Sequence, residues 1–169
     1  EYDETDVNGG CGSGFYLNGD DHVYSFTPST TDCYRLDLSA VDNWTGFFVF
    51  DDCPGTGTCV AASVEAGTDP DPVEVTLNAG TTYYIVISRN PAGVSPMGGQ
   101  CGNYTFTLDA CPPGVDCSDP FVINSTPFSQ AGMTTCFFFN DYTTSSCDGA
   151  NNDYMSGEDF VFEYQPPTS

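Results

Sequence analysis

The chain has 169 residues, with 24 acidic side chains against 2 basic ones and a formal net charge of -22. A surface this negative repels nucleic-acid phosphates and anionic lipids, so neither is expected as a partner. A hydrophobic content of 39% is enough for a packed core, and no apolar run is long enough for membrane insertion.

Short alternating or apolar segments follow one another along the chain, separated by turn residues. After a loop over residues 1–14, we expect strands at 22–27, 32–38, 44–50, 59–62, 73–77, 82–87 and 103–108. A further short strand at 121–123 and an apolar run at 136–139 come later, and no segment has helical periodicity. The pattern predicts an all-β fold, an antiparallel β-sandwich of the jelly-roll or immunoglobulin-like kind.

One strand pattern occurs twice. Residues 19–26 read Gly-Asp-Asp-His-Val-Tyr-Ser-Phe, and residues 157–164 read Gly-Glu-Asp-Phe-Val-Phe-Glu-Tyr. The two copies begin 157 − 19 = 138 residues apart. Self-similarity at that distance predicts a whole domain recurring in tandem, with a split domain because the chain opens partway into one copy and stops partway into the next. We expect a sandwich lacking its first strands over 1–111, a proline-rich linker over 112–116, and the N-terminal part of the next repeat over 117–169. This last part closes either onto its own chain or onto a neighbouring one.

Nine cysteines indicate an oxidising environment, extracellular or at the cell surface, because their spacings do not match paired zinc knuckles. Pairing within short loops, with one bridge stapling the two sheets, predicts Cys53–Cys59, Cys111–Cys117, Cys136–Cys147 and Cys33–Cys101. Cys11 is then left over, and its partner is expected upstream of residue 1.

Acidic pairs recur beside turns, and hard carboxylate oxygens are the ligands that calcium prefers. If these pairs converge at one end of the sandwich, they form a calcium site from Asp20, Asp21, Asp51, Asp52, Glu158 and Asp159. The alternative is that they are solvated turn residues. Calcium is the one candidate cofactor, and the fold requires none.

Three sequons make Asn43, Asn103 and Asn124 candidates for N-glycosylation. In a eukaryotic secretory route one or more of them would be used, whereas in most bacteria they would be accidents of composition. O-linked sugar on the Thr and Ser residues is left open, because sequence spacing alone does not select them.

Motifs of known enzyme classes are absent from the sequence, including the nucleophile elbow, the zinc-protease helix and the phosphate-binding loop. The single histidine, His22, corresponds to Phe160 in the second copy of the repeated strand. A catalytic role shared by both copies is therefore excluded, and we expect no enzyme and no catalytic residues.

Two of the expected strands, 44–50 and 83–87, are apolar on both faces. One face of each would meet the core, which predicts an exposed assembly surface of Phe47, Val49, Tyr84 and Val86. Monomers rarely leave such patches uncovered, so a neighbouring repeat, another chain or a glycan would cover it. The alternative cover is the unit's own loop at 90–99.

Several segments resemble bacterial pre-peptidase C-terminal domains: Gly-Asp-Asp-x-Val-Tyr-x-Phe, Cys-Tyr-Arg-Leu-Asp-Leu, Asp-Asp-Cys-Pro, Ala-Gly-Thr-Thr-Tyr-Tyr-Ile-Val-Ile and Asn-Tyr-Thr-Phe-Thr-Leu. The likeness spans residues 15 to 109 and extends to tandem versions on large secreted proteins of Bacteroidetes-type bacteria, which residues 154–162 resemble. The resemblance implies a jelly-roll-like sandwich that serves as an attachment, spacer or binding module.

These observations predict a structural repeat unit of an extracellular filament, stalk or large surface adhesin. Its partners are copies of itself, which assemble head to tail through strand complementation and an apolar β-surface. The alternative is a calcium-assisted module of a secreted multidomain protein that binds a glycan or a protein. A long filament favours the first function, and saturable binding by a monomer favours the second.

Overall fold

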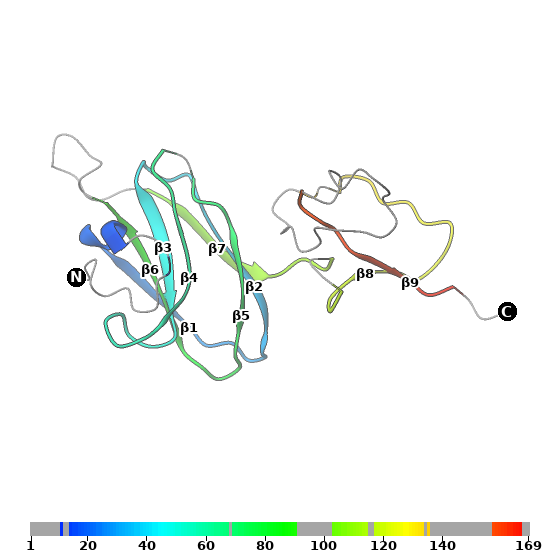
Figure 1. Cartoon of the computed structure of the whole chain (residues 1–169), viewed down its shortest axis with the longest axis horizontal. Helices are drawn as coiled ribbons and strands as arrows, with labels where there is room; N and C mark the ends of the chain where they lie inside the picture. The colour runs from blue at the N-terminus through cyan, green and yellow to red at the C-terminus, as the bar shows by residue number, and fades with distance from the viewer. Residues whose placement is uncertain are drawn as a thin grey trace, which may run out of the picture. The chain divides into compact units, whose positions relative to one another are not determined.

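The computed structural model describes residues 11, 14–67, 69–90, 103–114, 117–133, 135 and 157–166. The chain forms two compact units, Glu1–Ala110 and Cys111–Ser169, which we name unit 1 and unit 2 (Figure 1). Among the described residues the secondary structure is strand, apart from one short 3-10 helix. The predicted all-β class is confirmed.

Unit 1 contains one short helix and seven strands within its described residues. Their bounds are η1 (Gly14–Asn18), β1 (His22–Phe26), β2 (Asp32–Ser39), β3 (Thr45–Phe50), β4 (Cys59–Val64), β5 (Val73–Leu77), β6 (Tyr83–Arg89) and β7 (Thr105–Ala110). Each expected strand is present, and β5 has the predicted bounds. The loop expected over residues 1–14 lies outside the described residues except for Cys11 and Gly14, and Gly14 begins η1.

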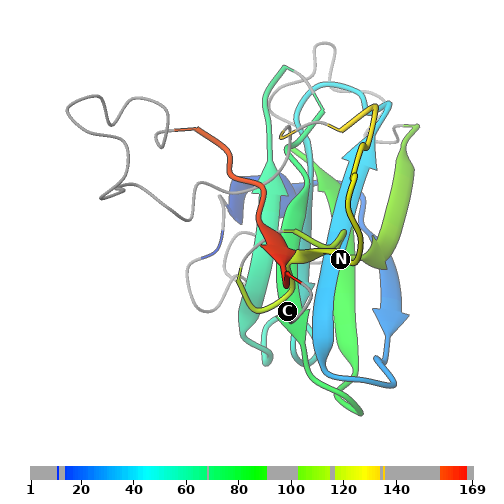
Figure 2. The same cartoon turned by 90° about the vertical axis from the view of Figure 1, so that its right-hand side faces the viewer.

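The strands of unit 1 form two antiparallel sheets, which run side by side in Figure 2. The four-stranded sheet has the order β1-β6-β3-β4, and the three-stranded sheet has the order β5-β2-β7. In β2, Leu36 and Leu38 are fully buried while Arg35 and Asp37 alternate with them on the other face. The strand expected at 32–38 is therefore an antiparallel strand with one buried face.

Apolar side chains from both sheets meet in one core, which gives unit 1 a sandwich-like arrangement. The three-stranded sheet contributes Leu36, Leu38 and Leu77. The four-stranded sheet contributes Phe47, Val49, Ala61, Tyr83, Ile85 and Ile87. Side chains of alternating residues in β3 and β6 therefore point toward the other sheet.

The other face of the four-stranded sheet is covered by the N-terminal segment. Tyr16 and Leu17 of η1 pack with Phe48, Phe50 and Val86 in a second buried cluster. Leu17 is fully buried, so η1 lies on the sheet as part of the fold. This cover explains why β3 is apolar on both faces: each face has its own apolar layer.

The predicted assembly surface is therefore wrong. Phe47, Val49 and Val86 are fully buried, and Tyr84 is half-buried. Phe47 and Val49 face the core between the sheets, whereas Val86 lies under η1. The proposed alternative cover, the loop at 90–99, lies almost entirely outside the described residues.

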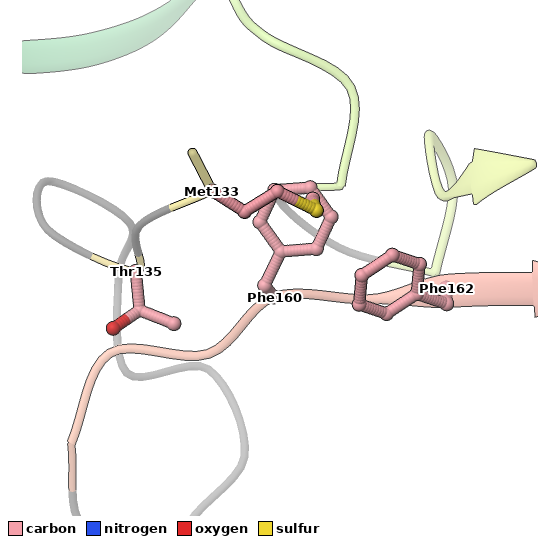
Figure 3. Close-up of a pocket in the computed structure, with 4 residues that line it drawn as sticks. All are labelled: Met133, Thr135, Phe160 and Phe162. Carbon is pink, nitrogen blue, oxygen red and sulfur yellow. The ribbon is translucent and has the colours of Figure 1, made fainter. Parts of the chain in front are cut away.

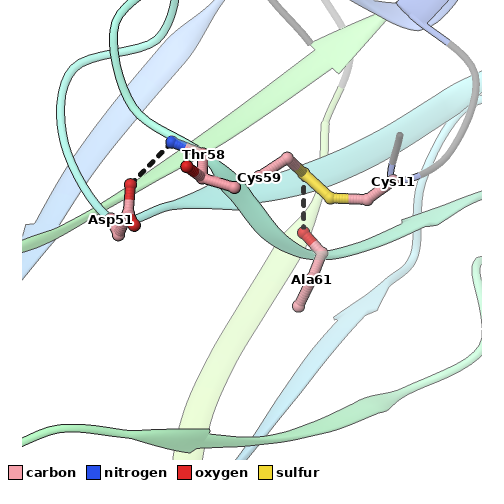
Figure 4. Close-up of a disulfide and its surroundings, with 5 residues drawn as sticks. All are labelled: Cys11, Asp51, Thr58, Cys59 and Ala61. Atoms are coloured by element: carbon pink, nitrogen blue, oxygen red, sulfur yellow. Dashed lines mark hydrogen bonds between the residues drawn. A yellow bond between two sulfur atoms is a disulfide. The ribbon is translucent and has the colours of Figure 1, made fainter. Parts of the chain in front are cut away.

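One disulfide links Cys11 to Cys59 at the start of β4, with the two Cα atoms 5.8 Å apart (Figure 4). Cys59 is buried, and its sulfur lies 3.4 Å from the Ala61 carbonyl oxygen. The predicted Cys53–Cys59 bridge is wrong, because Cys53 carries an exposed free thiol. The expectation that Cys11 pairs upstream of residue 1 is wrong as well.

Hydrogen bonds, and no disulfide, close the turn between β3 and β4. The Asp51 N–H donates to the Thr58 carbonyl at 3.1 Å, and the Thr58 N–H donates to the Asp51 carboxylate at 2.6 Å (Figure 4). The Cys53 carbonyl accepts the N–H groups of Thr56 and Gly57. The turn thus keeps its shape while the Cys53 side chain faces water.

Two other cysteines, Cys33 and Cys111, are also disulfide-bonded. The register of β2 with β7 sets Tyr34 opposite Ala110, so Cys33 and Cys111 take the next positions along these two strands. Cys117 carries an exposed thiol, so the predicted Cys111–Cys117 bridge is wrong. Three cysteines of the predicted pairs lie outside the described residues: Cys101, Cys136 and Cys147.

Unit 2 contains two short strands among its described residues, β8 (Phe121–Ile123) and β9 (Phe162–Tyr164). They pair in parallel, with Phe121 opposite Phe162 and Ile123 opposite Tyr164 (Figure 1). The strand predicted at 121–123 has these bounds, and the second copy of the repeated pattern forms β9. The apolar run at 136–139 lies outside the described residues.

Candidate functional site

The candidate site lies in unit 2, where backbone hydrogen bonds join the β8–β9 pair to Gly114. The Val161 N–H donates to the Gly114 carbonyl, and the Phe121 N–H donates to the Val161 carbonyl, both at 2.9 Å. The Gly114 N–H donates to the Asp119 carbonyl at 2.7 Å. These bonds fix the backbone just before β8 and β9 relative to Gly114. They therefore also position the phenylalanine side chains of these two segments.

Four phenylalanines form an aromatic cluster on this framework: Phe121, Phe128, Phe160 and Phe162. The ring centroids of Phe160 and Phe162 are 4.9 Å apart, and those of Phe121 and Phe162 are 5.8 Å apart. Phe128 lies 6.0 Å from Phe121. All three separations fall within the range in which aromatic pairs attract one another. The aromatic cluster is therefore a packed arrangement of side chains.

Gly114 lies directly against the Phe160 ring. A Cβ atom at this position would come within 2.6 Å of ring carbons of Phe160, and the backbone has a φ of +102°. Both the contact and the dihedral angle favour glycine. The glycine of the linker thus permits the close approach that places Phe160 in the aromatic cluster.

The aromatic cluster is only partly covered. Phe162 is 45% exposed and Phe128 is 40% exposed. Three further large apolar side chains of unit 2 are also exposed: Val122, Met133 and Tyr164. We name these five exposed residues together the apolar surface of unit 2. Phe128, Phe162 and Met133 lie at the aromatic cluster and its pocket, whereas Val122 alternates with Phe121 and points to the other face of β8. Exposed apolar surface that gathers in one small unit is typical of a docking site.

A pocket opens beside the aromatic cluster, lined by Met133, Thr135, Phe160 and Phe162 (Figure 3). Its volume is about 140 Å³. An apolar cavity of about 150 Å³ holds a ring the size of benzene, so this pocket fits one aromatic or aliphatic side chain. Among the described lining residues, the Thr135 hydroxyl is the one polar side-chain group and none is titratable. This lining suits the binding of an apolar group.

Sequence reasoning missed this site, although the repeated strand contains the signal for it. In the first copy Tyr24 takes the place of Phe162, is half-buried and packs against the core of unit 1. Its ring lies 5.6 Å from that of Phe106. In the second copy Phe162 has ring neighbours in the aromatic cluster but is still 45% exposed, and Tyr164 is 44% exposed.

A second group of interacting side chains in unit 1 was also not predicted. The hydroxyl groups of Tyr24 and Tyr104 are 2.8 Å apart, and the Tyr104 hydroxyl is hydrogen-bonded to Nδ1 of His22. The His22 ring stacks on that of Tyr24 at 4.5 Å. These contacts join β1 to the residue just before β7, and they engage the single histidine in a hydrogen-bonded structural contact.

Two tyrosines of unit 1 have raised pKa values. Burial is the main cause for Tyr104, and its hydrogen bond with Tyr24 raises the pKa further. Burial also raises the pKa of Tyr16, with a smaller contribution from the negative charge of Glu65. Both shifts disfavour the phenolate, so these hydroxyl groups stay protonated as hydrogen-bonding groups.

The acids predicted to bind calcium do not come together in unit 1. Strands β1 and β3 both pair antiparallel with β6, so they run in the same direction. Asp20 and Asp21 precede β1, whereas Asp51 and Asp52 follow β3, which places the two pairs at opposite ends of the sheet. The predicted convergence of these four acids is wrong. None of the described acids of the prediction belongs to a group of three potential metal ligands.

The carboxylates of the β3–β4 turn already have partners. Asp51 accepts a hydrogen bond from the Thr58 N–H, and Asp52 accepts one from the Cys53 N–H at 2.7 Å. Glu158 and Asp159 belong to unit 2, just before β9. The turn acids of unit 1 thus cap backbone donors, which is the ordinary role of aspartate in tight turns.

The three candidate glycosylation asparagines, Asn43, Asn103 and Asn124, are all exposed. In the first sequon the Thr45 side chain is buried and its hydroxyl donates to the Asp42 carbonyl at 2.7 Å. The asparagines are therefore accessible to modification, and their use stays a prediction.

No described helix has the length and apolar character needed to cross a membrane. Comparisons with protein-family models and with curated proteins find no match for this chain. The function must therefore be argued from the residues and contacts described above.

Proposed function

We propose that this protein is a structural repeat unit of an extracellular filament, stalk or large surface adhesin. Copies assemble head to tail through unit 2. The observation that supports this proposal is the apolar surface of unit 2, on which Phe162 is 45% exposed beside an open pocket. The repeated strand, the disulfides and the resemblance to tandem pre-peptidase C-terminal domains favour the same reading.

The strand edges of unit 2 support assembly through strand complementation. Strands β8 and β9 have three residues each, and each has one strand partner among the described residues. Two paired strands alone are marginally stable in water, because their outer backbone groups lack partners. Open edges of this kind pair with further strands, which supplies the missing hydrogen bonds and covers apolar side chains.

Negative charge makes such assembly sensitive to salt. The basic side chains are already paired within unit 1: Arg35 with Glu74 at 3.3 Å, and Arg89 with Asp42 at 3.7 Å. The net charge of -22 therefore acts between copies as repulsion. Ions screen exposed charges beyond about 8–10 Å at physiological salt, so assembly should strengthen as salt increases.

Sedimentation and electron microscopy of the full chain test the proposal. We expect concentration-dependent assemblies for the wild type and loss of assembly for Phe162→Asp, which places a charge on the apolar surface. The matched control is Val60→Asp in β4 of unit 1, where the side chain is 39% exposed. Its assemblies should resemble those of the wild type. A wild type that stays monomeric at every concentration and salt would contradict the proposal.

The second candidate function is a binding module for a glycan or protein, assisted by calcium. The pocket of Met133, Thr135, Phe160 and Phe162 supports this alternative, because its size fits one side chain or ring. Calorimetric titration of the monomeric chain with aromatic peptides, with and without calcium, tests it. Saturable binding that Phe160→Ala abolishes, in a chain that forms no assemblies, would favour this second function.

A further inference from the structure

We propose that β8 of one copy adds in parallel to the open edge of β1 in another copy. This inference rests on the proposed head-to-tail assembly and names the contact that forms it. It is drawn from the two copies of the repeated strand, which share a pattern but differ in their neighbours.

The second copy of the repeated strand, β9, shows which kind of strand pairs with this sequence pattern. Strand β9 pairs in parallel with β8, with Phe121 opposite Phe162, Val122 opposite Glu163 and Ile123 opposite Tyr164. Strand β1 is the first copy of the same pattern and is the outer strand of its sheet, with β6 as its one strand partner. In the part of unit 1 that the structure describes, β1 has no β8-like neighbour.

The edge of β1 is accessible. His22 and Ser25 are exposed, and Val23 is 39% exposed. An edge strand with accessible backbone accepts an extended segment by β-strand addition, in which main-chain hydrogen bonds provide affinity. Side chains that match the alternation of the receiving strand provide specificity.

The side chains of β1 match those that β8 already meets. Transferred to β1, the register sets Phe121 opposite Tyr24, Val122 opposite Ser25 and Ile123 opposite Phe26. Within unit 2 the same residues face an aromatic, a polar and again an aromatic side chain. Strand β1 presents the same order of aromatic, polar and aromatic side chains. Strand β8 would therefore meet the same types of side chain on β1 as on β9.

Charge favours β8 over β9 as the donor. The strand Phe121–Ile123 is uncharged, whereas β9 contains Glu163. The donor strand therefore places no charged side chain of its own beside β1, although each copy has a net charge of -22. Because β8 and β1 are different surfaces, the contact is heterologous and propagates from copy to copy without closing.

Engineered cysteines in the full chain test this contact. We would substitute Val122→Cys in one sample and Ser25→Cys in another, both with Cys53→Ser and Cys117→Ser to remove the exposed native thiols of the described residues. Neighbouring strands lie about 4.8 Å apart, which suits a disulfide. After mixing and mild oxidation, linked dimers should form several-fold more with Ser25→Cys than with the control Thr107→Cys, an exposed position on the edge strand β7 of the other sheet.

A second pair tests the strand direction. In a parallel contact Asn124→Cys should link to Thr27→Cys, whereas an antiparallel contact would link it to Val23→Cys. Equal yields with Ser25→Cys and Thr107→Cys, in chains that still form filaments, would overturn this inference and leave the proposed function intact. Chains that neither assemble nor link would overturn both.

Discussion

Unit 1 and unit 2 each contain one copy of the repeated strand, and the two copies meet different surroundings. In unit 1 the aromatic side chains of β1, Tyr24 and Phe26, are half-buried against a core made by two sheets. In unit 2 the corresponding residues of β9, Phe162 and Tyr164, are 45% and 44% exposed. The same alternation therefore gives a half-buried apolar face in one unit and an exposed apolar face in the other.

The difference shows that the strand pattern determines which face is apolar, whereas neighbouring elements determine whether that face is buried. Strand β6 pairs along the whole of β1, and Phe106 of the opposite sheet packs on Tyr24. Unit 2 has a short parallel neighbour, β8, and the aromatic cluster. Four substitutions or pairs of substitutions test this comparison, and the largest expected effect comes first.

Phe47→Ala in the core of unit 1 should lower the free energy of unfolding by about 3–5 kcal/mol, because it leaves a cavity in a fully packed site. The matched change Phe162→Ala should cost about 1 kcal/mol or less, since much of that side chain is already in water. Denaturant titration measures both values. Equal losses for the two variants would break the comparison, because they would show that Phe162 is as well packed as Phe47.

Removing the Cys11–Cys59 bridge with the double variant Cys11→Ala and Cys59→Ala should destabilise unit 1 by about 2–4 kcal/mol. The bridge spans 48 residues and anchors the segment before η1 to β4. The control is Cys53→Ser at the exposed thiol, which should change stability by less than about 0.5 kcal/mol. If Cys53→Ser destabilises as strongly, Cys53 takes part in a bridge, and non-reducing peptide mapping would identify its partner.

Gly114→Ala should destabilise unit 2 by about 1–3 kcal/mol more than Gly132→Ala, because only the first added methyl group overlaps a packed side chain. Both glycines have a positive φ, +102° and +77°, but nothing lies within 4 Å of a Cβ at Gly132. Hydrogen exchange of the Val161 amide, which donates to the Gly114 carbonyl, measures the local effect. Equal exchange rates in the two variants would mean that the Phe160 contact does not order unit 2.

The smallest expected effect is a pH dependence in unit 1. Burial raises the pKa of Tyr104 in the folded chain, whereas an unfolded tyrosine ionises near a pKa of about 10. The contribution to stability is therefore complete below about pH 10 and is lost as pH rises above it. Unfolding measured from about pH 8 to about pH 11 should show a shallower decline in Tyr104→Phe. An unchanged slope would indicate that the Tyr104 hydroxyl is not held by β1.

Local sequence patterns were sufficient for the strands themselves. The alternation in 73–77 and the short apolar run at 121–123 predicted β5 and β8 with the bounds that the structure shows. Turn residues and an alternation of period two are properties of a few neighbouring residues, so they can be read from the chain alone. The candidate site was harder to predict from the sequence, because the exposure of Phe162 depends on which elements cover it.

Sequence alone determined the all-β class and the repeated strand, since each rests on residue types and short spacings. Only the tertiary structure decided which face of β3 meets the other sheet, because Phe47 and Phe48 are equally apolar and both faces are covered. It also decided that Cys59 bonds to Cys11 and not to Cys53, although Cys53 is nearer in sequence. Distance along the chain does not determine distance in space once strands pair laterally, which is why burial and disulfide partners had to come from the fold.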